Sequence, residues 1–263
     1  MTLAPFGRRL LRVTKNDRVG AYNMLWVGDP DGPSDPEPGQ FYMLAAERDW
    51  GGGDGRPYLP RAFSFARAND AALAFLLEAI GPGTERLAEL EQGDGLWVTG
   101  PLGIGFTPPK RGRALLVGGG IGAAPLLCWR DALEPETTAL LGFRSAAHAE
   151  AQVYFPGARI ATDDGSVGHQ GFVTELLRAE LDEDPEATIY ACGPPPMLEA
   201  VRALAAERDV PAQLAMESGM ACGFGACMGC VVQTKSGYVR LCVDGPVVDA
   251  AELDNAWVPG APH

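Results

Sequence analysis

The spacing of hydrophobic and polar positions changes along the chain, and the N-terminal region has the rhythm of a β structure. In residues 1–108, short apolar or alternating segments are separated by turns, which is typical of antiparallel strands. These segments are 8–17, 20–29, 39–46, 61–68, 71–80 and 93–103. Residues 84–92 predict one short helix, and the glycine-rich stretch 47–60 predicts a mobile surface loop. The pattern as a whole predicts an antiparallel barrel.

Between residues 112 and 211 the pattern becomes a regular alternation of strands and helices. Nearly continuous apolar strands are predicted at 113–120, 138–145, 158–165 and 188–194. Helical patterns follow at 123–133, 171–181 and 196–208. This alternation predicts a buried parallel sheet flanked by helices.

The predicted fold class is therefore a β barrel plus an α/β unit, with a small third unit at the end. The stretch "PPKRG", residues 108–112, marks the boundary between the first two. We expect a barrel domain at 1–108, a nucleotide-binding α/β domain at 112–211 and a cysteine-containing domain at 216–263.

Composition narrows the classes of partner and the compartment. The chain has 263 residues and a net charge of −13, which disfavours nucleic acid and anionic membranes as partners. No window approaches the roughly 18–20 apolar residues of a membrane span, and the N-terminus lacks the apolar run of a signal peptide. We expect a cytoplasmic protein, in which six cysteines indicate metal binding or catalysis rather than disulfides.

Four of the cysteines follow the spacing C-x4-C-x2-C-x11-C: Cys222, Cys227, Cys230 and Cys242. This is the plant-type run that holds a [2Fe–2S] cluster. The glycines between them permit a tight loop whose amide N–H groups point at the sulfurs. A structural zinc site is the alternative, but zinc sites usually pair two C-x2-C units and only one is present here. The spacing favours iron and sulfur.

Two stretches of the barrel region have the chemistry of a phosphate site. Arg61 begins "RAFS", where a guanidinium could pair with a phosphate, and Gly83 and Thr84 precede a predicted helix whose first N–H groups are free. Each signal is weak alone, because an arginine in a strand is usually solvated and a Gly-Thr pair often serves only as a helix cap.

The stretch "LLVGGGIGAAPLL" predicts a strand, a glycine turn and a helix, an arrangement that lets the backbone approach a pyrophosphate. Gly118, Gly120 and Ala123 satisfy G-x-G-x-x-A. The turn also contains Gly119 and Gly122.

The acidic residue that usually contacts the ribose about twenty residues later is missing, and Arg144 lies there instead. Asp163 and Asp164, one strand later, would favour an unphosphorylated ribose, whereas Arg144 would suit a 2′-phosphate. These residues favour NAD, although both aspartates could equally be solvated turn carboxylates.

The order of these motifs resembles the ferredoxin reductase superfamily, in which a barrel binds flavin and an α/β domain binds nicotinamide. The resemblance implies that the strand Arg61–Ala62–Phe63–Ser64 and the turn at Gly83 and Thr84 bind FAD, with Arg61 and Thr84 on its phosphates and Ser64 near flavin N5. Leu76, Leu77 and Glu78 would also contact the flavin, although Leu77 and Glu78 replace the aromatic–basic pair common there.

In the same superfamily a Cys-Gly-Pro lies beside the nicotinamide ring, which here implies Cys192 and Gly193. Ser64 and Cys192 are thus the residues that the resemblance places at the reacting rings. The alternative for Cys192 is a buried core cysteine. Cys128, on the apolar face of a predicted helix, is assigned to the core.

Nearly the whole chain resembles the electron-transfer subunits of NAD-dependent (class 1B) dihydroorotate dehydrogenases. The stretches that carry this are "RAFS", "GPGT", "GPLGIGF", "GGGIGAAPL", "TDDGSVGHQGFVT", "CGPPPML" and "ESGMACGFGACMGC". The resemblance implies a partner, an FMN-containing catalytic subunit that oxidises dihydroorotate in pyrimidine biosynthesis. Electrons would pass through the [2Fe–2S] cluster and FAD to NAD+, in a heterotetramer of two of each subunit.

Two other functions fit parts of the same pattern. The chain could be the diaphorase subunit of another complex, such as an NADH-dependent ferredoxin:NADP oxidoreductase, a sulfite reductase or a hydrogenase. It could also be a non-catalytic nucleotide-sensing module whose cysteines hold zinc. A colourless protein without flavin would favour the zinc module.

Overall fold

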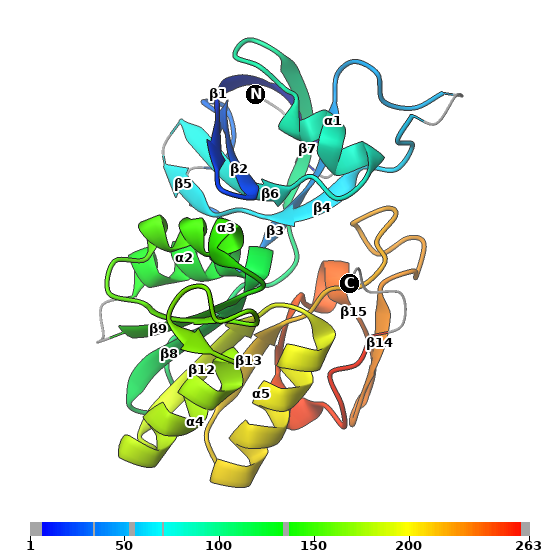
Figure 1. Cartoon of the computed structure of the whole chain (residues 1–263). Helices are drawn as coiled ribbons and strands as arrows, with labels where there is room; N and C mark the ends of the chain where they lie inside the picture. Colours follow the sequence, from blue (N-terminus) through cyan, green and yellow to red (C-terminus); the bar gives the residue numbers. More distant parts are fainter. Residues whose placement is uncertain (1–6, 34, 53–55, 70, 134–136, 259–263) are drawn as a thin grey trace.

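The N-terminal part of the protein is a seven-stranded antiparallel sheet that curves into a barrel (Figure 1). The computed structural model describes residues 7–33, 35–52, 56–69, 71–133 and 137–258. The strands are β1 (Arg9–Val19), β2 (Tyr22–Gly28), β3 (Phe41–Ala46), β4 (Arg61–Ser64), β5 (Arg67–Asn69), β6 (Ala72–Glu78) and β7 (Gly95–Leu102), in the order β4-β3-β7-β1-β2-β6-β5. The short helix α1 (Pro82–Ala88) follows β6.

The position of strand β6 between two cores explains why its sequence is apolar almost without interruption. Leu73, Phe75 and Leu77 pack inside the barrel, whereas Ala74 and Leu76 pack in the core that the barrel shares with the α/β unit. Successive side chains of a strand point to opposite faces, so both faces of β6 are buried.

The predicted barrel is present, with two local differences. The segment 61–68 is two strands, β4 and β5, and the helix predicted at 84–92 begins and ends earlier, at Pro82 and Ala88. The loop predicted at 47–60 separates β3 from β4, and its residues 53–55 lie outside the described residues.

The second sheet is parallel except at one edge. Its strands are β8 (Arg113–Gly119), β9 (Thr137–Phe143), β10 (Arg159–Thr162), β11 (His169–Gln170), β12 (Ala187–Cys192), β13 (Ala212–Ala215) and the antiparallel β16 (Val247–Asp249). The strand order is β11-β10-β9-β8-β12-β13-β16. The chain therefore enters the sheet at the central strand β8, adds β9 to β11 on one side, and then crosses to add β12, β13 and β16 on the other. The crossover creates a topological switch point between β8 and β12, where such sheets bind ligands.

Helices cover both faces of this sheet, as the alternation of apolar strands and helices predicts. On β8, Leu115 and Val117 pack with α4 (Val173–Glu183) and α5 (Pro195–Arg208). Ala114 and Leu116 pack on the opposite face with α2 (Ala123–Ala132). None of the helices in the described part of the chain combines the length and the apolar character that crossing a bilayer needs.

The α/β unit and the C-terminal region contain elements that the pattern of hydrophobic positions did not predict. The strand β13 has only four residues, too few to show a period, and α3 (Ala146–Ala149) is a single turn. The cysteine loop leads into a hairpin of β14 (Val231–Thr234) and β15 (Gly237–Arg240), followed by α6 (Leu241–Asp244). Because β16 pairs with β13, this third unit is joined to the second sheet. The domain limits drawn above stay predictions.

The barrel is anchored to the second sheet by an aromatic cluster and by hydrogen bonds from the connecting segment. Phe106 stacks on Trp129 at 5.8 Å between ring centroids, and Tyr190 contacts both rings edge-on. The carbonyl oxygen of Thr107 accepts hydrogen bonds from Tyr190 Oη (2.9 Å) and Gln213 Nε2 (3.0 Å). These contacts set how the barrel faces the sheet.

A nearly buried carboxylate ties helix α4 to the sheet. Glu180 on α4 accepts a hydrogen bond from Arg113 Nη1 at 2.7 Å and also pairs with Arg159 on β10. Burial opposes the charged form, but the hydrogen bonds from the two arginines prevail and hold the pKa of Glu180 below its ordinary value.

Glu180→Gln should therefore lower the free energy of unfolding at pH 7 by about 2 kcal/mol, since the two guanidinium groups lose a charged acceptor. The native pKa is depressed, so the wild-type advantage is complete above the ordinary glutamate pKa and disappears as the pH falls through the native pKa. Urea unfolding at pH 7 and at acidic pH measures this difference. The exposed Glu183→Gln on the same helix is the control, and equal losses in both variants at pH 7 would contradict the assignment.

Candidate functional site

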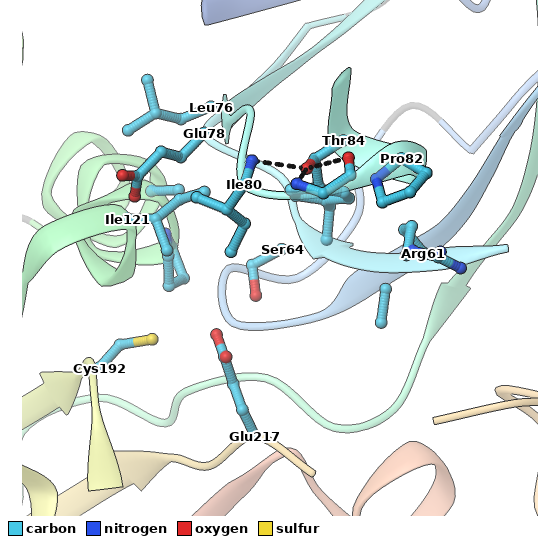
Figure 2. A pocket seen from close by; sticks show the side chains of 16 residues that line it. Arg61, Ser64, Leu76, Glu78, Ile80, Pro82, Thr84, Ile121, Cys192 and Glu217 are labelled. Atoms are coloured by element: carbon cyan, nitrogen blue, oxygen red, sulfur yellow. Dashed lines mark hydrogen bonds between the residues drawn. The ribbon is translucent and has the colours of Figure 1, made fainter. Parts of the chain in front are cut away.

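A cavity of about 290 Å³ lies where the barrel faces the carboxyl ends of the parallel strands (Figure 2). Most residues that line it come from β4, the β6–α1 segment and the end of β12. Nine of the predicted cofactor-binding residues are among them: Arg61, Ala62, Phe63, Ser64, Leu76, Glu78, Gly83, Thr84 and Cys192. The fold thus brings together three segments that are far apart in the sequence.

One predicted contact residue, Leu77, lies elsewhere. Its side chain is fully buried among the barrel residues and lines neither this cavity nor the second one described below. The alternation of β6 turns the side chain of Leu77 inward while Leu76 and Glu78 face the cavity, so the predicted flavin contact at Leu77 would have to come from its backbone.

At one end of the first cavity, Arg61 and Gly83 form a cradle for an anion. A Cβ atom at position 83 would lie 2.6 Å from Arg61 Nε, so a larger residue there would displace the guanidinium from the place that it has beside Gly83. Arg61 donates a hydrogen bond to the carbonyl of Leu59 and lies 5.7 Å from the ring of Trp50. Within the described part of the chain no carboxylate pairs with Arg61, so its charge is available to a phosphate.

Thr84 lines the same end of the cavity, but its hydroxyl is engaged within the chain. Thr84 Oγ1 donates to the carbonyl of Gly81 at 3.0 Å and accepts from the N–H groups of Ile80 (2.9 Å) and Gly81 (3.1 Å). These bonds, drawn in Figure 2, fold the turn before α1. The hydroxyl has the capping role that the sequence left as the alternative for this Gly-Thr pair.

Ser64, Cys192 and Glu217 meet in the middle of the cavity (Figure 2). Cys192 ends β12 and Glu217 follows β13, and these parallel strands pair with Cys192 opposite Ala215. Both side chains therefore emerge at the carboxyl edge of the sheet. Burial raises the pKa of the Cys192 thiol well above its ordinary value, and the nearby Glu217 adds to the shift, so Cys192 is a neutral thiol at pH 7.

Glu217 is a site residue that the sequence analysis missed. Its side chain is exposed to the cavity, and its carboxyl group points into that space. The protein around the group withholds part of its hydration, which raises its pKa above the ordinary value. The signal would have been its place two residues after a strand of the parallel sheet. That strand, β13, has four residues and was too short to be predicted, so the sequence did not indicate that Glu217 follows a strand of the sheet.

A second cavity of about 550 Å³ opens at the topological switch point of the parallel sheet. Gly119, Gly120, Gly122 and Gly193 line it. A Cβ atom at Gly122 would lie 2.2 Å from the carbonyl oxygen of Cys192, so the turns after β8 and β12 touch through glycine backbone. Such bare backbone is what a dinucleotide phosphate needs at this place.

Gly118, the first glycine of the motif, does not line this cavity. A Cβ atom there would lie 2.8 Å from Leu141 Cδ2 on the neighbouring strand β9 and 3.3 Å from the Cα of Ala123. This glycine serves the packing of strand and helix, and its contact with a cofactor stays a prediction.

The residues expected to face the ribose separate in the structure. Asp163 lines the second cavity, whereas Asp164 accepts hydrogen bonds from Ser166 N (3.0 Å) and Ser166 Oγ (2.6 Å) and closes a turn. Arg144 also lines the cavity, but its guanidinium pairs with Glu78, with 2.5 Å between Nη2 and Oε1. The cation considered for a 2′-phosphate therefore already has a partner.

The cysteine loop packs against the barrel and directs backbone N–H groups at its sulfurs. Gly223, with φ +81°, lies so close to β3 that a Cβ atom would meet Met43 Cγ at 2.6 Å. The N–H group of Gly225 donates to Cys242 Sγ at 3.1 Å, and that of Cys227 donates to Cys222 Sγ at 3.4 Å. Burial opposes the thiolate of Cys222, but such backbone hydrogen bonds lower its pKa to about 6.

The four predicted ligands are arranged as two pairs of thiols. Besides burial, which raises both pKa values, the nearby Cys227 thiol acts to lower the pKa of Cys222, and the nearby Cys230 thiol acts to raise that of Cys242. Among the described residues, no three histidine, cysteine, aspartate or glutamate side chains converge as they would around one metal ion. Two thiol pairs fit the two irons of a [2Fe–2S] cluster better than a single tetrahedral zinc ion.

Comparison with known families matches two parts of the chain. Residues 217–254 match the iron–sulfur cluster binding domain of dihydroorotate dehydrogenase B. Residues 144–203 match the oxidoreductase NAD-binding domain. The first match contains all four cysteines of the run and favours the iron–sulfur interpretation over the zinc module.

Solved structures with the same fold include a ferredoxin–NADP oxidoreductase and a ferredoxin reductase. An NADH-dependent reduced ferredoxin–NADP oxidoreductase superposes with a TM-score of 0.79 at 24% identity, over 94% of this chain and 90% of that one. A ferredoxin reductase of carbazole 1,9a-dioxygenase superposes with a TM-score of 0.66 at 25% identity, over 77% and 66%. They confirm the predicted combination of a barrel with an α/β unit.

Curated relatives cover most of the chain. The dihydroorotate dehydrogenase B (NAD(+)) electron transfer subunit of Clostridium acetobutylicum is 37% identical over 92% of this chain and 95% of its own length. The probable counterpart from Methanopyrus kandleri is 34% identical over 88% and 86%. The chain therefore belongs to the family of dihydroorotate dehydrogenase B electron transfer subunits, as the order of its sequence motifs indicates.

Proposed function

We propose that this chain receives electrons from a partner subunit that oxidises dihydroorotate and delivers them to NAD+, using a [2Fe–2S] cluster and FAD. The observation that carries the proposal is the wall common to the two cavities. Glu78, Ile80, Ile121 and Glu217 line both of them, so a flavin in the first cavity and a nicotinamide in the second would be neighbours. The cysteine loop packs against the same barrel.

The first cavity fits FAD. Arg61, with the room left by Gly83, would hold a phosphate, and the strand Arg61–Ser64 would lie along the cofactor. A bound flavin supplies the exchange of electron pairs with nicotinamide and of single electrons with an iron–sulfur cluster. Ser64 and the neutral thiol of Cys192 would orient the rings, and the carboxyl group of Glu217 would lie beside them.

The second cavity fits NAD. The glycine backbone after β8 and β12 would take the phosphates, and the carboxylate of Asp163 would favour a free ribose hydroxyl over a 2′-phosphate.

The cysteine loop fits the cluster that its family match describes. The pairs Cys222–Cys227 and Cys230–Cys242 would each bind one iron, and the N–H groups aimed at sulfur would stabilise the thiolates. Cys227 is exposed, and Phe224 and Met228 beside it present apolar surface. This exposed edge would face the electron donor.

The donor we propose is an FMN-containing catalytic subunit, in a cytoplasmic heterotetramer of two of each chain. The curated relatives are electron transfer subunits by name, which implies a catalytic partner. A diaphorase role in another complex is the second candidate, because the NADH-dependent ferredoxin–NADP oxidoreductase shares the fold over nearly the whole chain.

Affinity purification of the full chain from its native cell separates these two functions. The proposal expects an FMN-containing partner in equal amount and reduction of NAD+ when dihydroorotate is added to the complex. A large partner with several iron–sulfur clusters, and no response to dihydroorotate, would instead establish the diaphorase role.

Cys227→Ala should remove the cluster and leave the flavin and nucleotide cavities intact, because the exposed Cys227 lines neither of them. We expect loss of iron and acid-labile sulfide, unchanged flavin content, and NADH oxidation by a dye at the wild-type rate. Dihydroorotate-dependent reduction of NAD+ by the complex should fall to background.

The matched control is Cys128→Ala, which replaces a half-buried cysteine of α2. This variant should keep both NADH oxidation by the dye and dihydroorotate-dependent reduction of NAD+. A Cys227→Ala complex that transfers electrons from dihydroorotate to NAD+ at the wild-type rate would show that the cluster is not in the path.

A further inference from the structure

The second cavity has an unfavourable charge for the ligand that it is proposed to bind. Among the described residues that line it, Glu78, Asp163 and Glu217 are acidic and Arg144 is the one basic residue. A dinucleotide brings at least two negative phosphate charges into this setting. Apart from backbone N–H groups, Arg144 is thus the group in the lining that can offset them.

Arg144 is held by a carboxylate of the barrel. It follows β9, while Glu78 ends β6, so their ion pair of 2.5 Å between Nη2 and Oε1 crosses from the α/β unit to the barrel. Glu78 lies on the wall that the two cavities share. The carboxylate therefore occupies a guanidinium that a phosphate would otherwise bind.

Within this ion pair the side chain of Glu78 is held in place, whereas that of Arg144 is free to move. The side chain of Glu78 is 17% exposed and its Oε1 lies 3.3 Å from His148 Nε2, while His148 Nδ1 lies 2.9 Å from Ser145 Oγ. The side chain of Arg144 is 65% exposed. An ion pair with such an exposed partner contributes little stability, so Arg144 can leave a fixed Glu78 at low cost.

We propose that Glu78 and Arg144 form a charge latch that sets the dinucleotide affinity of the second cavity. In the free protein Glu78 holds Arg144, and a dinucleotide phosphate draws Arg144 away as it binds. Glu78 therefore weakens nucleotide binding, and Arg144 is a phosphate-binding residue whose availability Glu78 controls. The inference rests on the proposed function of this cavity as the nucleotide site.

A double-mutant cycle tests the latch. NAD+ and NADP+ are titrated by calorimetry into the flavin-containing full chain as wild type, Glu78→Gln, Arg144→Gln and the double variant. Glu78→Gln should bind about 2- to 5-fold more tightly, the range that an exposed ion pair represents. Arg144→Gln should bind more weakly, and Glu78→Gln should bring no gain when Arg144 is absent.

The two nucleotides identify the phosphate. A gain with both NAD+ and NADP+ assigns Arg144 to the pyrophosphate, and a gain confined to NADP+ assigns it to the 2′-phosphate; either supports the latch. The matched control is Glu186→Gln, which breaks an exposed pair with Arg111 outside both cavities and should leave both affinities unchanged.

Two results would overturn the latch while leaving the proposed function in place. One is wild-type affinity in Glu78→Gln. The other is an equal gain from Glu78→Gln with and without Arg144, which would mean that Glu78 only repels the phosphates. A wild-type chain that binds neither nucleotide would contradict the proposed function as well.

Discussion

The structure depends on how the barrel meets the carboxyl ends of the parallel strands. Cys192 and Glu217 end adjacent strands of the sheet, and Ser64 faces them from the barrel. The wall that the two cavities share forms only where the barrel packs on the parallel sheet. The stacked Phe106 and Trp129, with the hydrogen bonds of Thr107, hold that seating through packing in the interior. The site is therefore a property of the interface between the units and not of either unit alone.

The third unit is attached to both of the others, which gives the chain a fixed order of sites. Gly223 of the cysteine loop lies against Met43 of the barrel, and β16 extends the parallel sheet beside β13. A cluster held by the four cysteines would be placed on the side of the barrel, with Cys227 at the surface. The proposed nucleotide, flavin and cluster sites would thus run from the sheet through the barrel to an exposed edge, as expected of a subunit that conducts electrons to and from a partner.

The parts of the candidate site that depend on residue spacing along the chain could be predicted from the sequence. The cysteine run, the glycine turn after β8 and the barrel strand with Arg61 and Ser64 could be identified because each is a short contiguous pattern. The long apolar strands and helices of the α/β unit were predictable for the same reason.

The remainder depends on which face or neighbour a residue has in three dimensions. The side chain of Leu77 points into the barrel because side chains alternate along β6. The hydroxyl of Thr84 hydrogen-bonds within its own turn. Glu217 reaches the cavity because it follows β13, a strand of only four residues. The pairing of Glu78 with Arg144 joins positions 66 residues apart. No local period or spacing encodes these contacts, because the packing of the barrel on the sheet creates them.

The central claim is that the flavin and nicotinamide sites share one wall. Its most direct test is anaerobic titration of the purified full chain, without any partner, with NADH. The account predicts that the protein is coloured and that NADH bleaches its flavin absorbance stoichiometrically. Bound flavin that NADH leaves unreduced, or a colourless protein that contains zinc, would contradict it.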